Sequence, residues 1–435
     1  MEVELPRLAV EKVVLPSGLR VLVCPMEGRV SCSTVFAVNI GSRVERPKEE
    51  GIAHFIEHLV FKGGQRWRSA HAVAEAIERL GGAINASTDR EQTAFWTRVP
   101  AGSWESAWDV LADIVLEPAF REEDIPKEKR VVIEELRMYK DSPQDYVESL
   151  FDEALWPHHA LGRDVAGDEE SVMQLTRNQV LSFHGEEYRP DQVVVCVTGG
   201  CSSDTVLRGV EERLQHLDIP PTASSRISVP PPDLQKAFVW NPRDTEQTNV
   251  VLGTRGLAYT DERRFPLDLA LTILGDGMSS RLFVRLREDA GLVYDVRASM
   301  TNYCDAGDTT IAFACDPDAT VEAWDAALHT VDGIVDEGIR PEELRKAKDY
   351  LLGHLALGLE DTGAVAEFLC EHEILLGKVL QPEELAERIE AVTADEVVTV
   401  LHDIVQVQEL SCAVDGPLPN PELLKDRIEK RNANR

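Results

Sequence analysis

The sequence predicts an α+β protein made of two similar domains, each an antiparallel sheet backed by helices. Three observations favour this fold class. The chain has 435 residues, more than a single hydrophobic core usually organises. Strand-like and helix-like segments follow one another in the same order in both halves, which is typical of a duplicated unit. Between the halves, residues 216–235 are rich in proline and serine without periodicity, as expected of a linker.

In the first half, period-two alternation predicts strands before and after a group of helices. The strands are expected in KVVLPSGLRVLVCPM, a hairpin that turns at Ser17-Gly18, and in SCSTVFAVNIGSR, INASTDREQTAFWTRVP and VVVCVTGG. The helices are expected over residues 47–63, 69–82, 103–116 and 122–141 and in TRNQVLSFHGEEYRPDQ. Ser69 and Gly81-Gly82 mark the start and end of the second helix.

The second half repeats this order. Strands are expected in AFVWNPRD, TNVVLGTRGL, VYDVRASMTNY and DTTIAFACD. Helices are expected in FPLDLALTILGDG, SSRLFVRLREDAG, VEAWDAALHTVDGIVDEG and PEELRKAKDYLLGHLALGLED, followed by further helices, a short strand at ELSCAVDG and a polar tail. We therefore expect a domain at 1–215, a linker at 216–235 and a second domain of the same fold at 236–435.

The charge and the cysteines exclude several classes of protein. The net charge is −32, from 77 acidic and 45 basic residues, which argues against a nucleic-acid binder and could favour basic peptide partners. No apolar run reaches the 18 residues that a membrane span needs, and the first residues lack the apolar core of a secretory signal. The 8 cysteines are scattered and form no C-x-x-C, as expected of reduced thiols in a cytoplasmic protein.

The segment GIAHFIEHLVFKG, residues 51–63, carries the strongest chemical signal. Each helical residue turns about 100°, so His54, Glu57 and His58 share one narrow wedge of a mostly apolar helix. Buried polar groups need partners, and a histidine pair at i, i+4 can converge on one zinc ion. The order H-x-x-E-H inverts the commoner H-E-x-x-H. The pattern alone leaves open a plain helix with two hydrogen-bonded histidines.

A catalytic zinc site usually has a third protein ligand. The helix EKRVVIEELRMYKD offers Glu128, Glu134 and Glu135. Glu128 and Glu135 are seven residues apart and point the same way, whereas Glu134 is turned about 120° from them, toward solvent. The helical phase favours the first pair and leaves open which of the two touches the metal.

These motifs in this order resemble the M16 metallopeptidases, and the resemblance extends over nearly the whole chain. It implies that His54, His58 and Glu135 hold one zinc ion per chain. It also implies that Glu57 is the general base, acting on the zinc-bound water. By the same resemblance, Glu128 supports the zinc ligands without binding the metal itself. The length is similar to that of the small, processing-peptidase-like branch, in which each chain is half of a clamshell.

Two further matches extend the resemblance. GGAINASTDREQTAFW is similar to the family's substrate-binding edge strand, with Asn85 and Ala86 leading it. GMSSRLFVRLREDAGLVYDVRA is similar to a second-half motif, and implies that Arg287 and Tyr294 assist catalysis. Because the clamshell separates the zinc half from the Arg/Tyr half, we expect a homodimer with shared sites. A heterodimer with a related subunit is the alternative.

The expected reaction is zinc-dependent endopeptidase cleavage of unfolded peptides or flexible protein termini, which can add to an edge strand as folded proteins cannot. One rival is a non-catalytic or structural subunit that kept the fold, although such subunits lose motif residues and this chain has the whole set. The other is a small-molecule metal lyase like the S-ribosylhomocysteine lyases, which share H-x-x-E-H but are single small domains.

Overall fold

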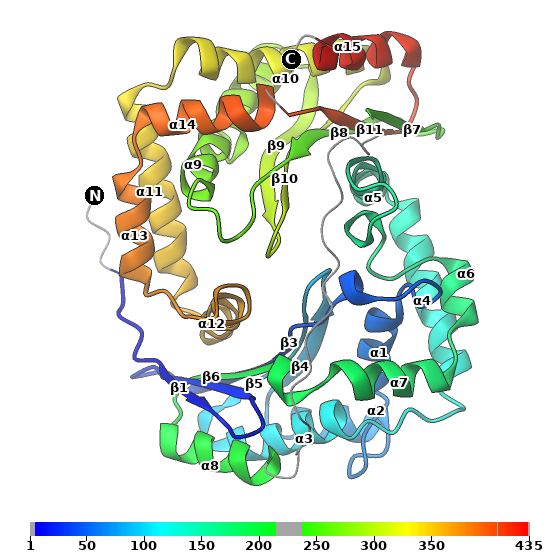
Figure 1. The fold of residues 1–435 in the computed structure, drawn as a ribbon, viewed down its shortest axis with the longest axis vertical. Helices are drawn as coiled ribbons and strands as arrows, with labels where there is room; N and C mark the ends of the chain where they lie inside the picture. Colours follow the sequence, from blue (N-terminus) through cyan, green and yellow to red (C-terminus); the bar gives the residue numbers. More distant parts are fainter. Residues whose placement is uncertain (1–4, 215–236, 407, 434–435) are drawn as a thin grey trace.

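The computed structural model describes residues 5–214, 237–406 and 408–433. Two β-sheets with helices around them make up the molecule, one sheet in the lower and one in the upper part of Figure 1. The expected linker, residues 216–235, lies outside the described residues.

The first sheet is six-stranded within the described residues. Its order is β1 (Glu11–Val14), β2 (Arg20–Pro25), β6 (Val193–Gly199), β3 (Ser31–Val38), β5 (Thr93–Pro100) and β4 (Ala83–Thr88). Among the described strands β4 pairs with β5 alone, and it is therefore an edge strand of this sheet.

Within the described residues, the second sheet repeats the first without a counterpart of β1. Its order is β7 (Phe238–Asn241), β11 (Ser411–Asp415), β8 (Thr248–Arg255), β10 (Gly307–Cys315) and β9 (Val293–Asn302). In chain order, β7 to β11 take the places of β2 to β6. The matching orders confirm the predicted fold of two similar sheets backed by helices.

The expectation of an antiparallel sheet in each half needs one correction. In each sheet the first and last strands of the repeated unit lie side by side and run parallel: β2 with β6, and β7 with β11. The remaining neighbours are antiparallel. The parallel pairs arise because most of the helices of a unit lie between these two strands in the chain, and such a long connection can return to the same end of the sheet.

Helices cover both sheets. In the first half they are α1 (Ile52–Val60), α2 (Ala70–Glu78), α3 (Trp104–Leu116), α4 (Ile125–Asp141), α5 (Pro143–Leu155), α6 (Glu169–Gln174), α7 (Arg177–Glu187) and α8 (Ser203–Leu214). In the second they are α9 (Arg264–Gly275), the π-helix η6 (Phe283–Asp289), α10 (Thr320–Glu337), α11 (Pro341–Gly358), α12 (Thr362–Leu376), α13 (Pro382–Ala391), α14 (Ala394–Leu401) and α15 (Pro421–Ala433). Each half has its own apolar core between one face of its sheet and its helices.

The two halves also exchange one helix each (Figure 1). α12, from the second half, packs on β3 and β6 of the first sheet. Its Leu369 and Cys370 share a small core there with Val35 and Cys196. α5, from the first half, packs in the same way on β8 and β11 of the second sheet. The halves are thus joined by buried apolar surface, and the expected domain boundaries stay a prediction.

The polar tail expected after the last strand is wrong in part, because residues 421–433 form α15. Pro421 stands in its first turn, where its fixed φ suits a helix. Leu424 and Ile428, four residues apart, are buried in the second core. The charged side chains on the other face hid this short apolar spacing. Among the described residues, no helix combines the length and the apolar character that crossing a membrane requires.

Candidate metal centre

Helix α1, which carries H-x-x-E-H, is held at its N-terminus by two features. Gly51 has φ 85°, and a Cβ there would lie 2.3 Å from the Ala166 carbonyl oxygen, so glycine is required. The buried Glu45 carboxylate accepts hydrogen bonds from Gly51 N at 2.9 Å and from Ala53 N at 3.0 Å. It satisfies donors that a helix start otherwise leaves unpaired, and so fixes the axis of the motif helix.

Helices α1 and α4 bring two histidines and one glutamate together. The Oε2 atom of Glu135 lies 3.3 Å from Nε2 of His58 and 3.9 Å from Nε2 of His54. One ligand atom from each residue lies within 4.8 Å of the other two. Two imidazole nitrogens and a carboxylate oxygen form the donor set of a catalytic zinc site with an open fourth position. These three residues could therefore hold a zinc ion.

A second carboxylate, that of Glu128, holds the His58 ring of this cluster in place. Oε1 of Glu128 lies 3.0 Å from Nδ1 of His58, and Oε2 of Glu128 lies 2.6 Å from Nζ of Lys62. With Nδ1 donating its proton to Glu128, Nε2 of His58 keeps its lone pair for a metal. The helical phase of α4 explains why Glu128 and Glu135 face the histidines and Glu134 does not. Glu134 points outward, with a side chain 72% exposed, and pairs with Arg137 at 2.7 Å.

Burial and charge set the pKa values of the two histidines apart. Burial, and then the neighbouring His58, lower the pKa of His54 to about 4, which leaves its imidazole neutral as a metal ligand must be. Burial would lower the pKa of His58 as well. The Glu128 hydrogen bond and the carboxylates of Glu135, Glu128 and Glu57 outweigh it and raise that pKa. A cluster this rich in carboxylates attracts a cation.

Glu57 lies on the same helix, between the two histidines. Its Oε2 atom accepts a hydrogen bond from Thr88 Oγ1 at 2.6 Å. Burial raises the pKa of this carboxyl, against the opposing effect of the Thr88 hydrogen bond. A carboxylate with a raised pKa beside a metal-type donor set is well matched to accepting a proton near neutral pH.

A cavity of about 300 Å³ opens beside the cluster. His54 and Glu135 line it, together with Thr88, Arg90, Tyr139, Asp145, Glu148, Ser149, Asp164, Val165 and Ala166. The Arg90 guanidinium in its wall is paired with Asp152. The wall carries more carboxylates than cations, so the cavity favours a cationic group.

The residues expected to bind substrate lie on the edge strand beside this cavity. β4 contacts α1 and β5, and no other strand in the part of the chain that the structure describes pairs with its second side. Asn85 is exposed and Ala86 half-buried on it, while Thr88 at its end lines the cavity. Because the Thr88 hydroxyl hydrogen-bonds the Glu57 carboxylate, this end of β4 lies next to the histidine motif.

Arg287 and Tyr294 are not brought to this cluster. Arg287, on η6, lies over the ring of Phe283 with its guanidinium carbon 4.9 Å from the centroid. Tyr294, near the start of β9, is 55% exposed. Within the described residues, neither makes a hydrogen bond or ion pair with the histidines or Glu135. Both stand on the second half, whereas the cluster is on the first.

Sequence reasoning missed three participants: Thr88, Lys62 and the acidic wall. Lys62 follows His58 by four residues, so the same helical spacing that picked out the histidines could have pointed to it. Thr88 and the acidic wall are joined to the motif by tertiary contact alone, for which the spacing gives no signal.

A second group of possible ligand atoms, Glu91, Cys304 and Asp305, lies where the two halves meet. It already holds a cation, because Arg43 pairs with Glu91 at 2.6 Å and with Asp305 at 2.7 Å. It is therefore an ion-pair junction.

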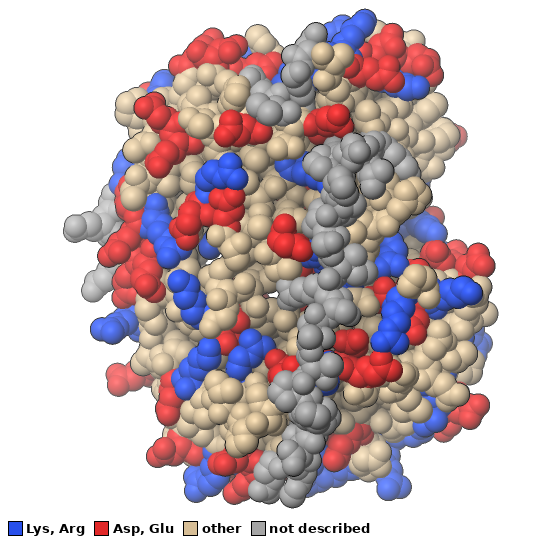
Figure 2. Space-filling model, in the orientation of Figure 1, with Lys and Arg blue, Asp and Glu red and all other residues tan. Residues whose placement is uncertain are grey.

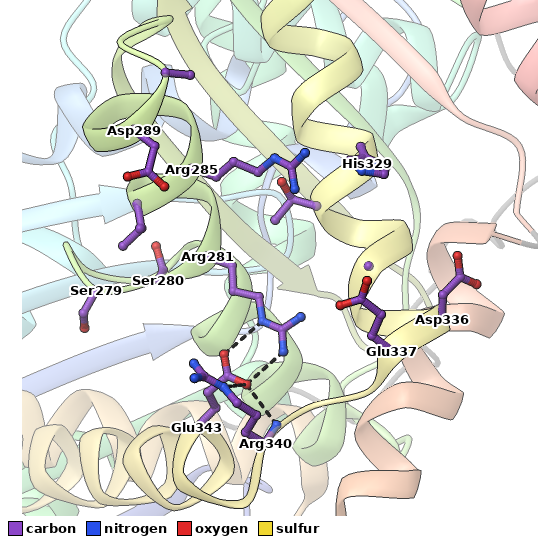
Figure 3. A pocket seen from close by; sticks show the side chains of 14 residues that line it. Ser279, Ser280, Arg281, Arg285, Asp289, His329, Asp336, Glu337, Arg340 and Glu343 are labelled. Atoms are coloured by element: carbon purple, nitrogen blue, oxygen red, sulfur yellow. Dashed lines mark hydrogen bonds and ion pairs between the residues drawn. The ribbon is translucent and has the colours of Figure 1, made fainter.

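A larger cavity, of about 660 Å³, lies between η6 and α10 (Figure 3). Arg285 reaches across it toward His329, and Arg281 pairs with Glu343 at its edge. None of the predicted site residues lines this cavity, and it takes no part in the reaction proposed below.

The fold is shared with solved structures titled as M16-like peptidases and proteases. A protease from Helicobacter pylori has a TM-score of 0.87 at 21% sequence identity, covering 95% of this chain and 100% of that one. A structure titled peptidase M16 inactive domain, from Pseudomonas fluorescens, has a TM-score of 0.87 at 19% identity over 94% of this chain and 98% of that one. At these identities the likeness defines the fold class alone: a two-sheet α+β architecture that also occurs in peptidases.

The sequence comparisons are more specific. The family model for insulinase, peptidase family M16, matches residues 20–169, and the model for the peptidase M16 inactive domain matches residues 174–351. A protein named as an uncharacterized zinc protease of Mycobacterium leprae is 35% identical over 421 residues, 95% of this chain and 93% of the relative. A protein of the same description from Bacillus subtilis is 33% identical over 83% of this chain and 87% of its own. The chain belongs to peptidase family M16.

Proposed function

We propose that this chain is a zinc-dependent endopeptidase that hydrolyses unfolded peptides or flexible protein termini. One observation carries the proposal: two imidazole Nε2 atoms and the Glu135 carboxylate converge from α1 and α4, close enough to the Glu57 carboxylate that His58 and Glu135 both act on its pKa. The names of the relatives as zinc proteases support the choice of metal. The buried Nδ1 of His54, which has no hydrogen-bond partner within the described residues, also fits a histidine that acts through its other nitrogen.

His54, His58 and Glu135 would hold one zinc ion. Zinc in such a site supplies a Lewis acid for the scissile carbonyl and makes water more acidic. Glu128 and Lys62 keep the His58 ring in its orientation, so that this ligand is preorganised.

Glu57 acts as the general base. Its carboxylate takes a proton from the attacking water and then delivers it to the leaving amine nitrogen. The burial that raises the pKa of this carboxyl brings its proton affinity closer to neutral pH, which helps both transfers.

The substrate adds as a strand beside β4. Main-chain hydrogen bonds to residues such as Asn85 and Ala86 accept many sequences but require an extended backbone. A folded protein cannot present such a strand, so flexible segments are the expected substrates. The carboxylates around the cavity, with Asp145 and Asp164 among them, favour a lysine or arginine side chain there.

Arg287 and Tyr294 would complete the site from a second subunit. Both side chains are exposed and carry hydrogen-bond donors, which the stabilisation of a developing oxyanion would need. A two-fold homodimer would place each pair at the partner's cluster. A heterodimer with a related subunit would also do so, but would leave one of the two motifs in this chain unused.

The decisive experiment measures two quantities on the purified chain: metal content by mass spectrometry and cleavage of a quenched fluorescent peptide library. We expect about one zinc per chain and cleavage that a chelator abolishes and added zinc restores. A zinc-loaded chain that cleaves nothing would instead indicate a non-catalytic subunit of a peptidase-like complex.

A further inference from the structure

Thr88 makes a contact with the proposed general base that the family resemblance did not assign. Its Oγ1 atom donates a hydrogen bond to Oε2 of Glu57 over 2.6 Å. Thr88 is the last residue of β4, and Glu57 lies in the middle of α1. The strand along which a substrate would lie therefore contacts the base through this side chain.

Thr88 is the hydrogen-bond partner on which the orientation of Glu57 depends. Among the described residues, no other side chain or backbone N–H donates to the Glu57 carboxylate. A glutamate side chain has several rotatable bonds, and fixing it costs conformational entropy. A short hydrogen bond to a charged acceptor is strong enough to select one arrangement. It engages Oε2 and leaves Oε1 free to accept a proton.

The backbone around Thr88 is itself firmly held. In the turn that follows, the carbonyl oxygen of Asp89 accepts from Ser42 N at 3.1 Å, and that of Arg90 accepts from Arg43 N at 2.8 Å. The Arg90 side chain donates to the Leu161 carbonyl at 2.9 Å and pairs with Asp152 of α5.

The third residue of the turn, Glu91, joins it to the second half. Glu91 pairs with the buried Arg43 at 2.6 Å and accepts from Cys304 N, in the turn between β9 and β10, at 2.8 Å. The hydroxyl of Thr88 is thus a fixed point, anchored by both halves, and not a mobile surface group.

We propose that Thr88 is a positioning residue for the reaction, whose hydroxyl holds the Glu57 carboxylate so that Oε1 faces the attacking water. This inference rests on the proposed peptidase function. It assigns Thr88 no contact with metal or substrate and no share in the proton transfer itself. Its effect reaches the reaction through the geometry of Glu57 alone.

The test compares three variants with the wild-type chain. Thr88→Val keeps the shape and removes the hydroxyl, and Thr88→Ser keeps the hydroxyl. Thr97→Val is the matched control, because Thr97 lies in the adjacent strand β5 and its buried hydroxyl has no partner among the described residues. For each chain we would measure zinc content, kcat and KM, and determine the crystal structure without metal to see the Glu57 carboxylate.

We expect kcat of Thr88→Val to fall about tenfold or more, below the ~10²–10⁴-fold that a general base contributes, with KM and zinc content unchanged. In its crystal structure the Glu57 carboxylate should leave the wild-type position. Thr88→Ser should restore kcat to within about threefold of wild type and return the carboxylate to that position, and Thr97→Val should match wild type.

The outcomes separate the two proposals. An active wild type with an unaffected kcat in Thr88→Val, or an unmoved Glu57 carboxylate in that variant, overturns the positioning role and leaves the peptidase intact. A wild type that binds zinc and cleaves no peptide overturns the function, and the positioning role falls with it. If Thr88→Val does not fold, Thr88→Ala against Thr88→Ser makes the same comparison.

Discussion

Nδ1 of His58 lies 3.0 Å from Oε1 of Glu128, on the side of the ring opposite the atom that faces Glu135. The two carboxylates therefore meet one imidazole from both ends, seven residues apart on the same face of α4. Glu128 is nearly buried, with a side chain 4% exposed, whereas Glu135 opens into the cavity with 26%. The two carboxylates therefore differ in what they can do. Glu135 is free to bind a metal, whereas Glu128 is engaged with His58 and Lys62.

The three glutamates of α4 should separate by zinc affinity. Glu135→Gln removes a charged ligand and should weaken zinc binding most. Glu128→Gln should have an intermediate effect, since changing a residue that hydrogen-bonds a metal ligand typically costs ~10–100-fold in affinity or activity. Glu134→Gln should change little, because its side chain points to solvent. Competition with a chromophoric chelator measures all three. If Glu134→Gln weakens zinc binding most, the helical phase that we assign to α4 is wrong.

Glu57→Gln tests the general base. The amide has nearly the same shape but cannot accept the proton, so the variant should retain about one zinc per chain and lose at least ~100-fold in kcat, the lower range for a general base. Peptide cleavage and metal analysis on the same preparation check both parts. Near-wild-type cleavage by this variant would falsify the assignment of Glu57.

The parts of the site that the sequence could predict are those set by helical phase. The apolar spacing around His54 and the interval from Glu128 to Glu135 are properties of single helices, so periodicity reveals them. The hydrogen bond from Thr88 to Glu57 joins a strand to a helix, and no local pattern encodes it.

The fold also has features that local periodicity predicts and features that depend on tertiary contact. Alternation predicted the strands, and their repeated order indicated the duplication. The exchange of α5 and α12 depends on which sheet each helix covers in the folded chain, and an amphipathic pattern does not say which surface it will meet.

A buried carboxylate where the halves meet predicts a pH dependence of stability. Burial, reinforced by Asp152, raises the pKa of Asp308 on β10 from 3.8 to about 8, although Arg90 and a Thr301 hydrogen bond oppose it. The folded chain then keeps a proton that the unfolded chain releases above pH 3.8. This group favours folding fully at low pH, and its contribution is lost as pH rises toward 8.

Asp308→Asn, which cannot ionise, should therefore lose less stability than wild type between pH 5 and pH 8. We expect the difference in the free energy of unfolding to be roughly 1–3 kcal/mol, by analogy with other shifted carboxyls. Thermal melting of the metal-free chains at both pH values provides the comparison, with the exposed Asp426→Asn as the control. Parallel pH profiles for Asp308→Asn and wild type would contradict the prediction.

The separation of Arg287 and Tyr294 from the cluster of His54, His58 and Glu135 leads to the last prediction, which concerns assembly. If sites are shared across a two-fold dimer, two different inactive variants should complement each other. One is Glu57→Gln; the other combines Arg287→Ala with Tyr294→Phe. Each homodimer should be nearly inactive. In a mixed dimer, one site would collect both defects and the other would have none, so about half of the wild-type activity per dimer should return, by counting sites under two-fold symmetry.

The measurement requires co-expression with two different tags and sequential purification of the mixed dimer. Mixing the separately purified variants without exchange of subunits is the control, and it should remain inactive. If each chain built its site from its own residues, every site in the mixed dimer would carry a defect, and no activity would return. A chain that stays monomeric during active cleavage would contradict the shared site as well. A dedicated heterodimer partner would show itself differently, as activity that appears after adding that subunit and never in the mixed homodimer.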